Sequence, residues 1–332
     1  MEKRNNEIMQ KNKTLYGLLF SIITIFLSVI TAFNSEIILF AGMVALSSYA
    51  ISSYLLPKHY ALFTPIIVFI IVFSFSNNIY LSFFSILLFF PAGYLISVLF
   101  KKEIGIKNTL LFSIVPQVIA YGSLILTYIY IRGGALNLNS AKFVFSNYIE
   151  IINNSIAQYE KLFKLIYPKD IETANALFVQ FESYLIESVV PTIPSLLVLF
   201  IAFCIFIAFI ITKVVLKGCK FNISNNLDIK NFKVSKSVVI FTAISFLIIL
   251  VTGQSSVNVA FENVFLVLNG ALFLAGIALI INFMNLLKIV FWKKIIGFIC
   301  IAFLCLIGGA TIVSFFGGVS SFVEIENFKK KE

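Results

Sequence analysis

The side chains that can recognise a ligand in the apolar part of this chain are uncharged. In the apolar run 109–131, Pro116 is followed directly by Gln117, and Tyr121 lies one helical turn further on. A proline removes a backbone hydrogen bond from a helix, and a buried amide needs partners of its own. Gln117 and Tyr121 are therefore candidate ligand-binding residues in a broken helix. A kink that only serves packing explains the same pattern.

A second group of uncharged polar residues lies in the apolar run 264–287. Asparagine amides in a bilayer need hydrogen-bond partners, so they should face the interior of a helical bundle. They can either join helices to one another or bind an uncharged or amphiphilic ligand. The candidate ligand-binding residues here are Asn269, Asn282 and Asn285.

Catalytic and metal-binding patterns are absent from the sequence. The middle of each apolar run lacks Asp, Glu, Lys, Arg and His, so a general base at membrane depth is not expected. The chain has four cysteines without a CxxC pair, and His59 is its only histidine. We therefore expect neither an enzyme, nor a metal site, nor a bound cofactor.

Composition defines the elements that must hold these residues. Of 332 residues, 60% are hydrophobic and 12% are charged, and the net charge is +10. The mean hydropathy is +1.02. A soluble globular domain is roughly half apolar and a quarter charged, so we expect a membrane protein embedded in the lipid bilayer. The basic residues lie mostly in short gaps between apolar runs, which argues against nucleic-acid binding.

The apolar runs predict an all-α, polytopic transmembrane bundle of about nine spans, since a span needs roughly 20 residues. The predicted spans are 15–33, 37–56, 61–76, 79–100, 109–131, 192–216, 237–252, 264–287 and 295–316. Five regions follow: a cytoplasmic N-tail (1–14), five spans (15–132), an extracytoplasmic insert (133–190), four spans (191–317) and a C-terminal tail (318–332).

Alternation of basic residues sets the predicted orientation. Most of the 25 Lys and Arg residues lie in the N-tail and in every second gap, whereas the gaps 34–36, 77–78 and 253–263 have none. This pattern places the N-terminus in the cytoplasm. Nine spans then place the C-terminal tail outside the cytoplasm. Three lysines at 329–331 of that tail do not fit this placement, because lysines favour the cytoplasmic side.

The insert is expected to be helical. Apolar residues recur at intervals of three and four between Phe145 and Ile166 and again between Ala174 and Leu185, and Pro168 separates the two stretches. This spacing predicts a helical hairpin within 141–188 that packs over the bundle. A lid, a partner-docking arm and surface-lying amphipathic helices are the alternatives.

The order of short motifs resembles the YybS family of uncharacterised bacterial polytopic membrane proteins. The motifs are Lys13-Thr14-Leu15-Tyr16-Gly17, Pro57-Lys58-His59-Tyr60, Gly93-Tyr94 before Lys101-Lys102, Pro191 with Pro194, and Lys217-Gly218. The family's tail has an Asp-Phe-Arg-like ending, whereas this chain has Asn327-Phe328-Lys329. The resemblance implies location in a bacterial plasma membrane.

The N-terminal half of that family is similar to the substrate-binding S components of energy-coupling-factor transporters. This resemblance implies a six-helix bundle that docks on a coupling subunit through small residues of its first helix. Gly17 and Ser21 form such a small-xxx-small pair, and Ser28 is the third candidate. The insert 141–188 is the other candidate contact with a partner protein.

Together these features predict a substrate-binding or transport-associated membrane subunit for a small uncharged or amphiphilic ligand. That hypothesis requires a cavity among the first six spans, roofed by the insert and lined by Gln117, Tyr121 or asparagines. The alternative is a non-catalytic membrane interaction or scaffold protein that acts in envelope or differentiation processes. The alternative requires a packed core and an exposed apolar stripe on the insert.

Overall fold

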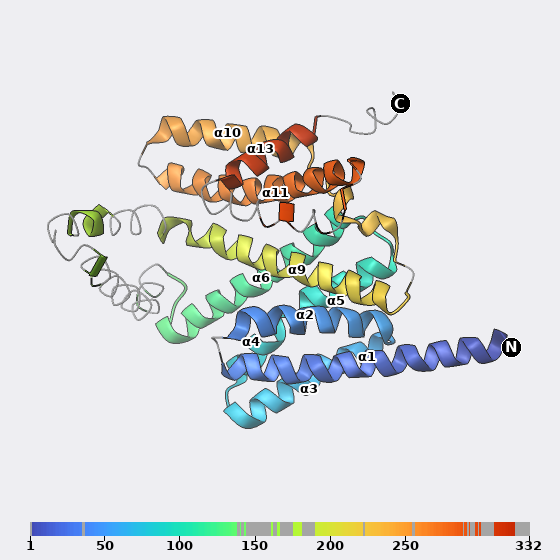
Figure 1. The fold of residues 1–332 in the computed structure, drawn as a ribbon. Helices are drawn as coiled ribbons and strands as arrows, with labels where there is room; N and C mark the ends of the chain where they lie inside the picture. The colour runs from blue at the N-terminus through green and yellow to red at the C-terminus, as the bar shows by residue number, and fades with distance from the viewer. Residues whose placement is uncertain are drawn as a thin grey trace.

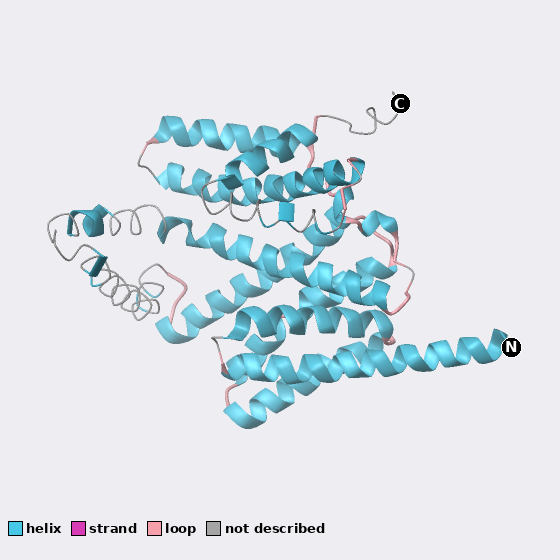
Figure 2. Ribbon diagram, in the orientation of Figure 1, coloured by secondary structure: helices cyan, strands magenta, loops and turns pink. Residues whose placement is uncertain are grey.

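A computed structural model describes most of the chain. The described residues are 2–34, 37–137, 140, 143, 161, 165–166, 175–180, 190–221, 223–253, 256–287, 289–290, 292, 296–297, 299 and 309–322. Within these ranges the secondary structure is helical, without a strand (Figures 1 and 2). The all-α prediction is therefore confirmed.

The helices divide into a larger N-terminal bundle and a C-terminal group. The first comprises α1 (Glu2–Phe33), α2 (Ile38–Leu55), α3 (Lys58–Ser76), α4 (Ile79–Leu87), α5 (Phe90–Lys101), α6 (Ile106–Gly133) and α9 (Ile193–Gly218). The second comprises α10 (Lys236–Thr252), α11 (Ser256–Leu286) and α13 (Ala310–Ser320). Short 3-10 turns η3 (Val190–Thr192), η4 (Asn225–Leu227) and η5 (Ile229–Asn231) flank α9 and α10. Contacts between α9 and α11 join the two groups (Figure 1).

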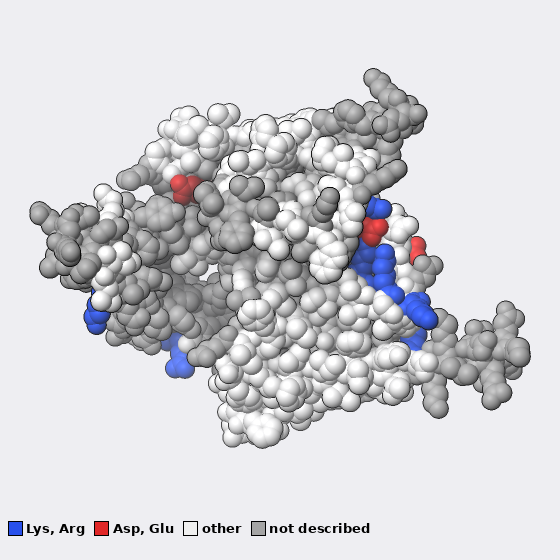
Figure 3. Space-filling model, viewed as in Figure 1, with Lys and Arg blue, Asp and Glu red and all other residues white. Residues whose placement is uncertain are grey.

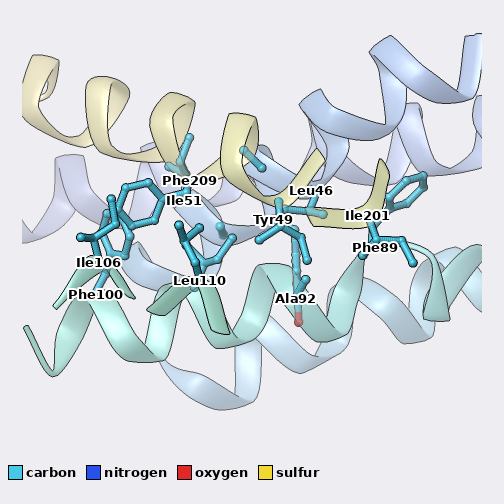
Figure 4. Packing of buried hydrophobic residues seen from close by; sticks show 14 of the residues in the cluster. Leu46, Tyr49, Ile51, Phe89, Ala92, Phe100, Ile106, Leu110, Ile201 and Phe209 are labelled. Atoms are coloured by element: carbon cyan, nitrogen blue, oxygen red, sulfur yellow. The ribbon is translucent and has the colours of Figure 1, made fainter. Parts of the chain in front are cut away.

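Helix α2 lies at the centre of the N-terminal bundle, where it packs against α1, α5 and α9. Its side chains from Ala45 to Leu56 are almost all buried, including those of four serines. Small residues let neighbouring backbones approach closely in a membrane bundle. The aromatic ring of Tyr49 lies next to Ala92 of α5 (Figure 4). It also meets the ring of Phe90 edge-on, with 4.5 Å between the ring centroids.

Among the described residues, six helices are long and apolar enough to cross a membrane. They are Asn12–Phe33, Lys58–Ser76, Ile79–Lys101, Ile106–Gly133, Ile193–Gly218 and Val257–Leu286. Two shorter apolar helices, Phe40–Leu55 and Lys236–Thr252, coincide with the predicted spans 37–56 and 237–252. A third, Ala310–Ser320, overlaps only the end of the predicted span 295–316, most of which lies outside the described residues. The structure thus supports a polytopic helical membrane protein, and the count of nine spans stays a prediction.

Several helices extend beyond the predicted spans. Helix α1 begins at Glu2, so the predicted N-tail is part of the first helix. Helix α11 begins at Ser256, whereas the predicted span begins at residue 264. The prediction began later because the first turns of α11 carry polar residues, which are typical of a loop. The last helix ends at Ser320 rather than at residue 316. The predicted hairpin 141–188 and the tail beyond residue 322 lie mostly outside the described residues.

Basic side chains gather at one end of the bundle (Figure 3). There the Lys101 ammonium donates to the Ser53 carbonyl oxygen at 2.7 Å, close to the C-terminal end of α2, where a cation is favourable. The Asp228 carboxylate pairs with Lys213 and lies within 4 Å of the ammonium groups of Lys217 and Lys230. Burial alone would raise the pKa of Asp228, but the three lysines together hold that pKa below its ordinary value.

Helices α11 and α13 approach each other at two glycines. A Cβ atom added at Gly317 would collide with the Leu272 carbonyl oxygen and with the backbone nitrogen of Gly276. A Cβ atom added at Gly276 would collide in turn with the carbonyl oxygen of Val313. Backbone cannot move aside as a flexible side chain can, so both positions require glycine.

Gly317→Ala should therefore separate α13 from α11. We expect the free energy of unfolding in detergent to fall by about 2 kcal/mol or more, because overpacking at a backbone contact cannot relax. Gly122→Ala in α6 is the matched control, since no atom lies within 4 Å of the added Cβ. Equal thermal unfolding of the two variants would contradict the close α11–α13 contact.

Candidate functional site

The helix is interrupted between α4 and α5, inside the single apolar span Ile79–Lys101. Helix α4 ends at Leu87 and α5 begins at Phe90, with Pro91 in its first turn. Proline lacks an N–H, so it cannot donate to the carbonyl oxygen of Leu87 four residues earlier. In an unbroken helix Ala92 would donate to the Leu88 carbonyl oxygen. The break therefore frees two carbonyl groups and one N–H at membrane depth.

The side chain of Gln117 satisfies these freed groups. Its Nε2 donates to the carbonyl oxygen of Leu87 at 2.6 Å and to that of Leu88 at 3.0 Å. Its Oε1 accepts from the backbone N–H of Ala92 at 3.1 Å. Gln117 is 1% exposed. One amide from α6 thus bridges both sides of the break, and both of its N–H donors are used.

A pocket lies beside this break, with a cavity volume of about 130 Å³. Its walls come from α2, from the α4–α5 break, from α6 and from α9. The lining residues are Gly42, Met43, Leu46, Phe84, Leu88, Phe89, Gln117, Tyr121, Phe200, Ile201, Cys204 and Ile205. Figure 4 labels Leu46, Phe89 and Ile201 where α2, α5 and α9 meet. An engineered apolar cavity of about 150 Å³ holds a benzene molecule, so the space suits a small compound.

The position of the pocket follows from the residues that form it. The α2 residues lie in the first half of α2, and the α9 residues lie in the first half of α9. The basic side chains follow the far ends of both helices, at Lys58 and Lys217. The pocket therefore lies in the half of the bundle away from the basic end.

Tyr121 supplies a second polar group. Its hydroxyl donates to the Leu88 carbonyl oxygen at 3.5 Å, at the long limit for a hydrogen bond, and its side chain is half-buried. Cys204 of α9 is also half-buried in the pocket wall. The lining residues that the structure describes include no Asp, Glu, Lys, Arg or His. The pocket is therefore apolar and uncharged, with its polar atoms gathered on the side of the helix break.

The structure places Gln117 and Tyr121 together in the pocket wall. The three candidate asparagines belong to α11 and are not among the lining residues. The backbone oxygen of Asn269 accepts from the Ser314 hydroxyl of α13 at 3.3 Å. The Asn282 amide donates to the Lys230 carbonyl oxygen at 2.7 Å, at the basic end. Asn285 is exposed near the end of α11. These contacts hold α11 against its neighbours, away from the pocket.

The predicted docking residues of the first helix face the chain's own α2 and α3. A Cβ atom added at Gly17 would lie 2.7 Å from the Leu56 side chain. The Ser21 hydroxyl lies 2.5 Å from that of Ser52, and it accepts from Thr64 at 3.3 Å. Ser28 is fully buried. A partner that docks on the first helix must therefore use its opposite, apolar face.

Glu262 lies near the start of a candidate membrane span, because α11 begins at Ser256. The prediction that the middle of each span lacks ionisable groups does not cover this position. The Oε1 of Glu262 accepts from the Asn258 amide at 3.0 Å. The next residue, Asn263, accepts from the backbone N–H of Ser195 at 3.0 Å and so joins α11 to the start of α9.

The pocket residues from α2 and α9 were also missed. Gly42 is the only one with a sequence signal, because a glycine in an apolar helix often marks a close approach. A Cβ atom there would lie 2.7 Å from the Phe89 ring, so Gly42 makes room for Phe89. Leucine, isoleucine and phenylalanine occur so often in this chain that no pattern distinguishes Phe200 or Ile201.

One family model matches residues 21–319, under the description "Predicted membrane protein (DUF2232)". The chain belongs to this family. The match covers α2 to α11 in full, so the pocket and the helix break both lie in family sequence. Neither a curated protein nor a solved structure matches the chain.

The Gln117 bridge can be tested by removing its amide. Gln117→Leu keeps the approximate volume but leaves the freed carbonyl groups and the Ala92 N–H without partners, and each such buried group costs about 1–3 kcal/mol. We expect the free energy of unfolding in detergent to fall by about 2 kcal/mol or more. Faster hydrogen exchange at the Ala92 amide should accompany the loss.

Ser113→Ala is the matched control on the same helix. The Ser113 hydroxyl is buried but donates to the Thr109 carbonyl oxygen of its own helix, so its loss disturbs no other element. If Gln117→Leu unfolded like Ser113→Ala, the amide would not hold the break.

Proposed function

We propose that this protein is a substrate-binding or transport-associated membrane subunit that binds a small uncharged or amphiphilic ligand. The observation that carries the proposal is the pocket at the α4–α5 break, lined by Gln117 and Tyr121. Transporters place their binding sites at interrupted helices, where freed backbone groups can line a cavity. A scaffold protein needs no such space.

The chemistry of the lining supports a neutral ligand. A charged group that leaves water for an apolar pocket without a counter-charge is strongly disfavoured. The side chains around the pocket offer hydrocarbon, aromatic rings, a thiol, a thioether, one amide and one phenol hydroxyl. This set suits binding better than catalysis, and we assign the protein no enzymatic role.

The cellular setting is part of the proposal. The basic end, which includes Lys101, Lys102 and Lys217, would face the cytoplasm of a bacterial plasma membrane, in agreement with the positive-inside rule. The N-terminus would then also be cytoplasmic, and the pocket would lie in the outer half of the bilayer. This arrangement agrees with the YybS-like and S-component-like resemblance of the sequence.

A coupling partner would complete such a transporter. The coupling partner would bind the exposed side of α1, where the side chains of Leu18, Ile22 and Phe26 are 47–67% exposed. The insert 141–188 is the second candidate contact. Gly17 and Ser21 are already buried within the chain, so they would hold α1 in place rather than contact the partner.

Filling the pocket tests the proposed function. Cys204→Phe adds a ring to a space of about 130 Å³ and should displace a bound compound. We expect wild-type protein, purified from native membranes and extracted for mass spectrometry, to carry a small molecule that the variant lacks.

Val214→Phe is the control, because it adds the same ring to an exposed position of the same helix. It should retain the compound. If wild type and Cys204→Phe carried the same small molecules, the pocket would not be a binding site.

A further inference from the structure

We propose that the pocket recognises a neutral compound with a single aromatic ring and one hydrogen-bond acceptor, such as an aryl ketone. The inference rests on the proposed function and names the ligand class of the same site. Three properties of the lining lead to it: the size and aromatic character of the walls, the Tyr121 hydroxyl as the strongest hydrogen-bond donor still available, and the lack of charge among the described lining residues. The Cys204 thiol is only a weak donor.

Size and wall chemistry favour a ring. A cavity of about 130 Å³ is close to the size that holds benzene. Four aromatic side chains surround it, and aromatic pairs gain from edge-on or offset contact beyond the burial of area. These side chains are Phe84, Phe89, Tyr121 and Phe200. A flexible alkyl chain would lose more conformational freedom in the same space and gain no ring contact.

The donors of the lining select an acceptor. Both Nε2 donors of Gln117 are used by carbonyl oxygens at 2.6 and 3.0 Å, so this amide has none left for a ligand. The Tyr121 hydroxyl has only the 3.5 Å contact with the Leu88 carbonyl oxygen. A ligand oxygen at ordinary distance offers this hydroxyl a better partner. Tyr121 is then the specificity-determining residue, and Gln117 a positioning residue.

The distribution of charge excludes ions. Among the described residues that line the pocket, Lys, Arg, Asp, Glu and His are absent. Lys213 is the lysine of the basic end that lies nearest to the pocket along α9, about two helical turns beyond the lining residue Ile205. Its ammonium pairs with Asp228, so it is not available to neutralise an anion in the pocket. A carboxylate with the same ring should therefore be rejected.

Four commercial probes separate these properties. Acetophenone has the ring and the acceptor, ethylbenzene has only the ring, 2-octanone has only the acceptor, and benzoate adds a charge. We would titrate each into nanodisc-embedded wild-type protein by saturation-transfer NMR and subtract the same titration on Cys204→Phe, which corrects for partition into lipid. Acetophenone should bind most tightly, ethylbenzene more weakly, and 2-octanone and benzoate least.

Tyr121→Phe tests the hydrogen bond without removing the ring. Acetophenone should bind roughly two- to tenfold more weakly to this variant, which corresponds to one neutral hydrogen bond. Ethylbenzene should bind as it does to wild type. Tyr94→Phe is the matched control, since Tyr94 packs against the core from α5 and does not line the pocket. It should leave both affinities unchanged.

The outcomes distinguish this inference from the proposed function. Equal or tighter binding of 2-octanone or benzoate would overturn the ring-and-acceptor assignment, as would an acyclic or charged compound in the mass spectra. The proposed function would survive, because a ligand would still occupy the pocket. If none of the probes distinguished wild type from Cys204→Phe and both carried the same native compounds, both would fail. Equal loss of acetophenone and ethylbenzene in Tyr121→Phe would overturn the role of the hydroxyl.

Discussion

A backbone N–H or carbonyl group that loses its helical partner inside a bilayer cannot form a hydrogen bond with water, so the protein must supply another partner. This requirement determines the structure around the α4–α5 break. Pro91 forces the loss, and the amide of Gln117 repairs it with three hydrogen bonds that reach from α6. The same bonds fix α4, α5 and α6 relative to one another. They thereby hold in place the wall of the pocket that the break and α6 supply.

The rest of the N-terminal bundle keeps those walls in place through close packing. Helix α2 contributes small and hydroxyl-bearing side chains to its interfaces, such as Ser52 against Ser21. Gly42 gives the Phe89 ring a place beside α2, which keeps that ring in the pocket wall. In the C-terminal group, Gly276 and Gly317 bring α11 and α13 into backbone contact. Small residues thus serve packing throughout, whereas the break frees the backbone groups that lie beside the pocket.

Composition and hydropathy were sufficient to predict a helical membrane protein, because apolar length alone sets a span. The pair Pro116-Gln117 indicated a buried amide in α6, but a sequence does not show which backbone groups that amide will meet. Asn269, Asn282 and Asn285 had the same chemical signal, and their contacts lie elsewhere. The start of α11 was misplaced because Asn258, Glu262 and Asn263 look like a loop until their partners are known. Periodicity in a sequence shows which residues share a face of one helix. It does not show which residues of α2, the α4–α5 break, α6 and α9 come together to line a pocket.

We infer that a ligand occupies the space beside the helix break. A cryo-electron-microscopy map of the protein in native-lipid nanodiscs would reveal such a ligand. We expect compact density between Tyr121 and Cys204, with Gln117 still bridging Leu87, Leu88 and Ala92. A map in which Phe89 and Phe200 fill the space, or in which a lipid acyl chain enters it from the bilayer, would contradict the claim.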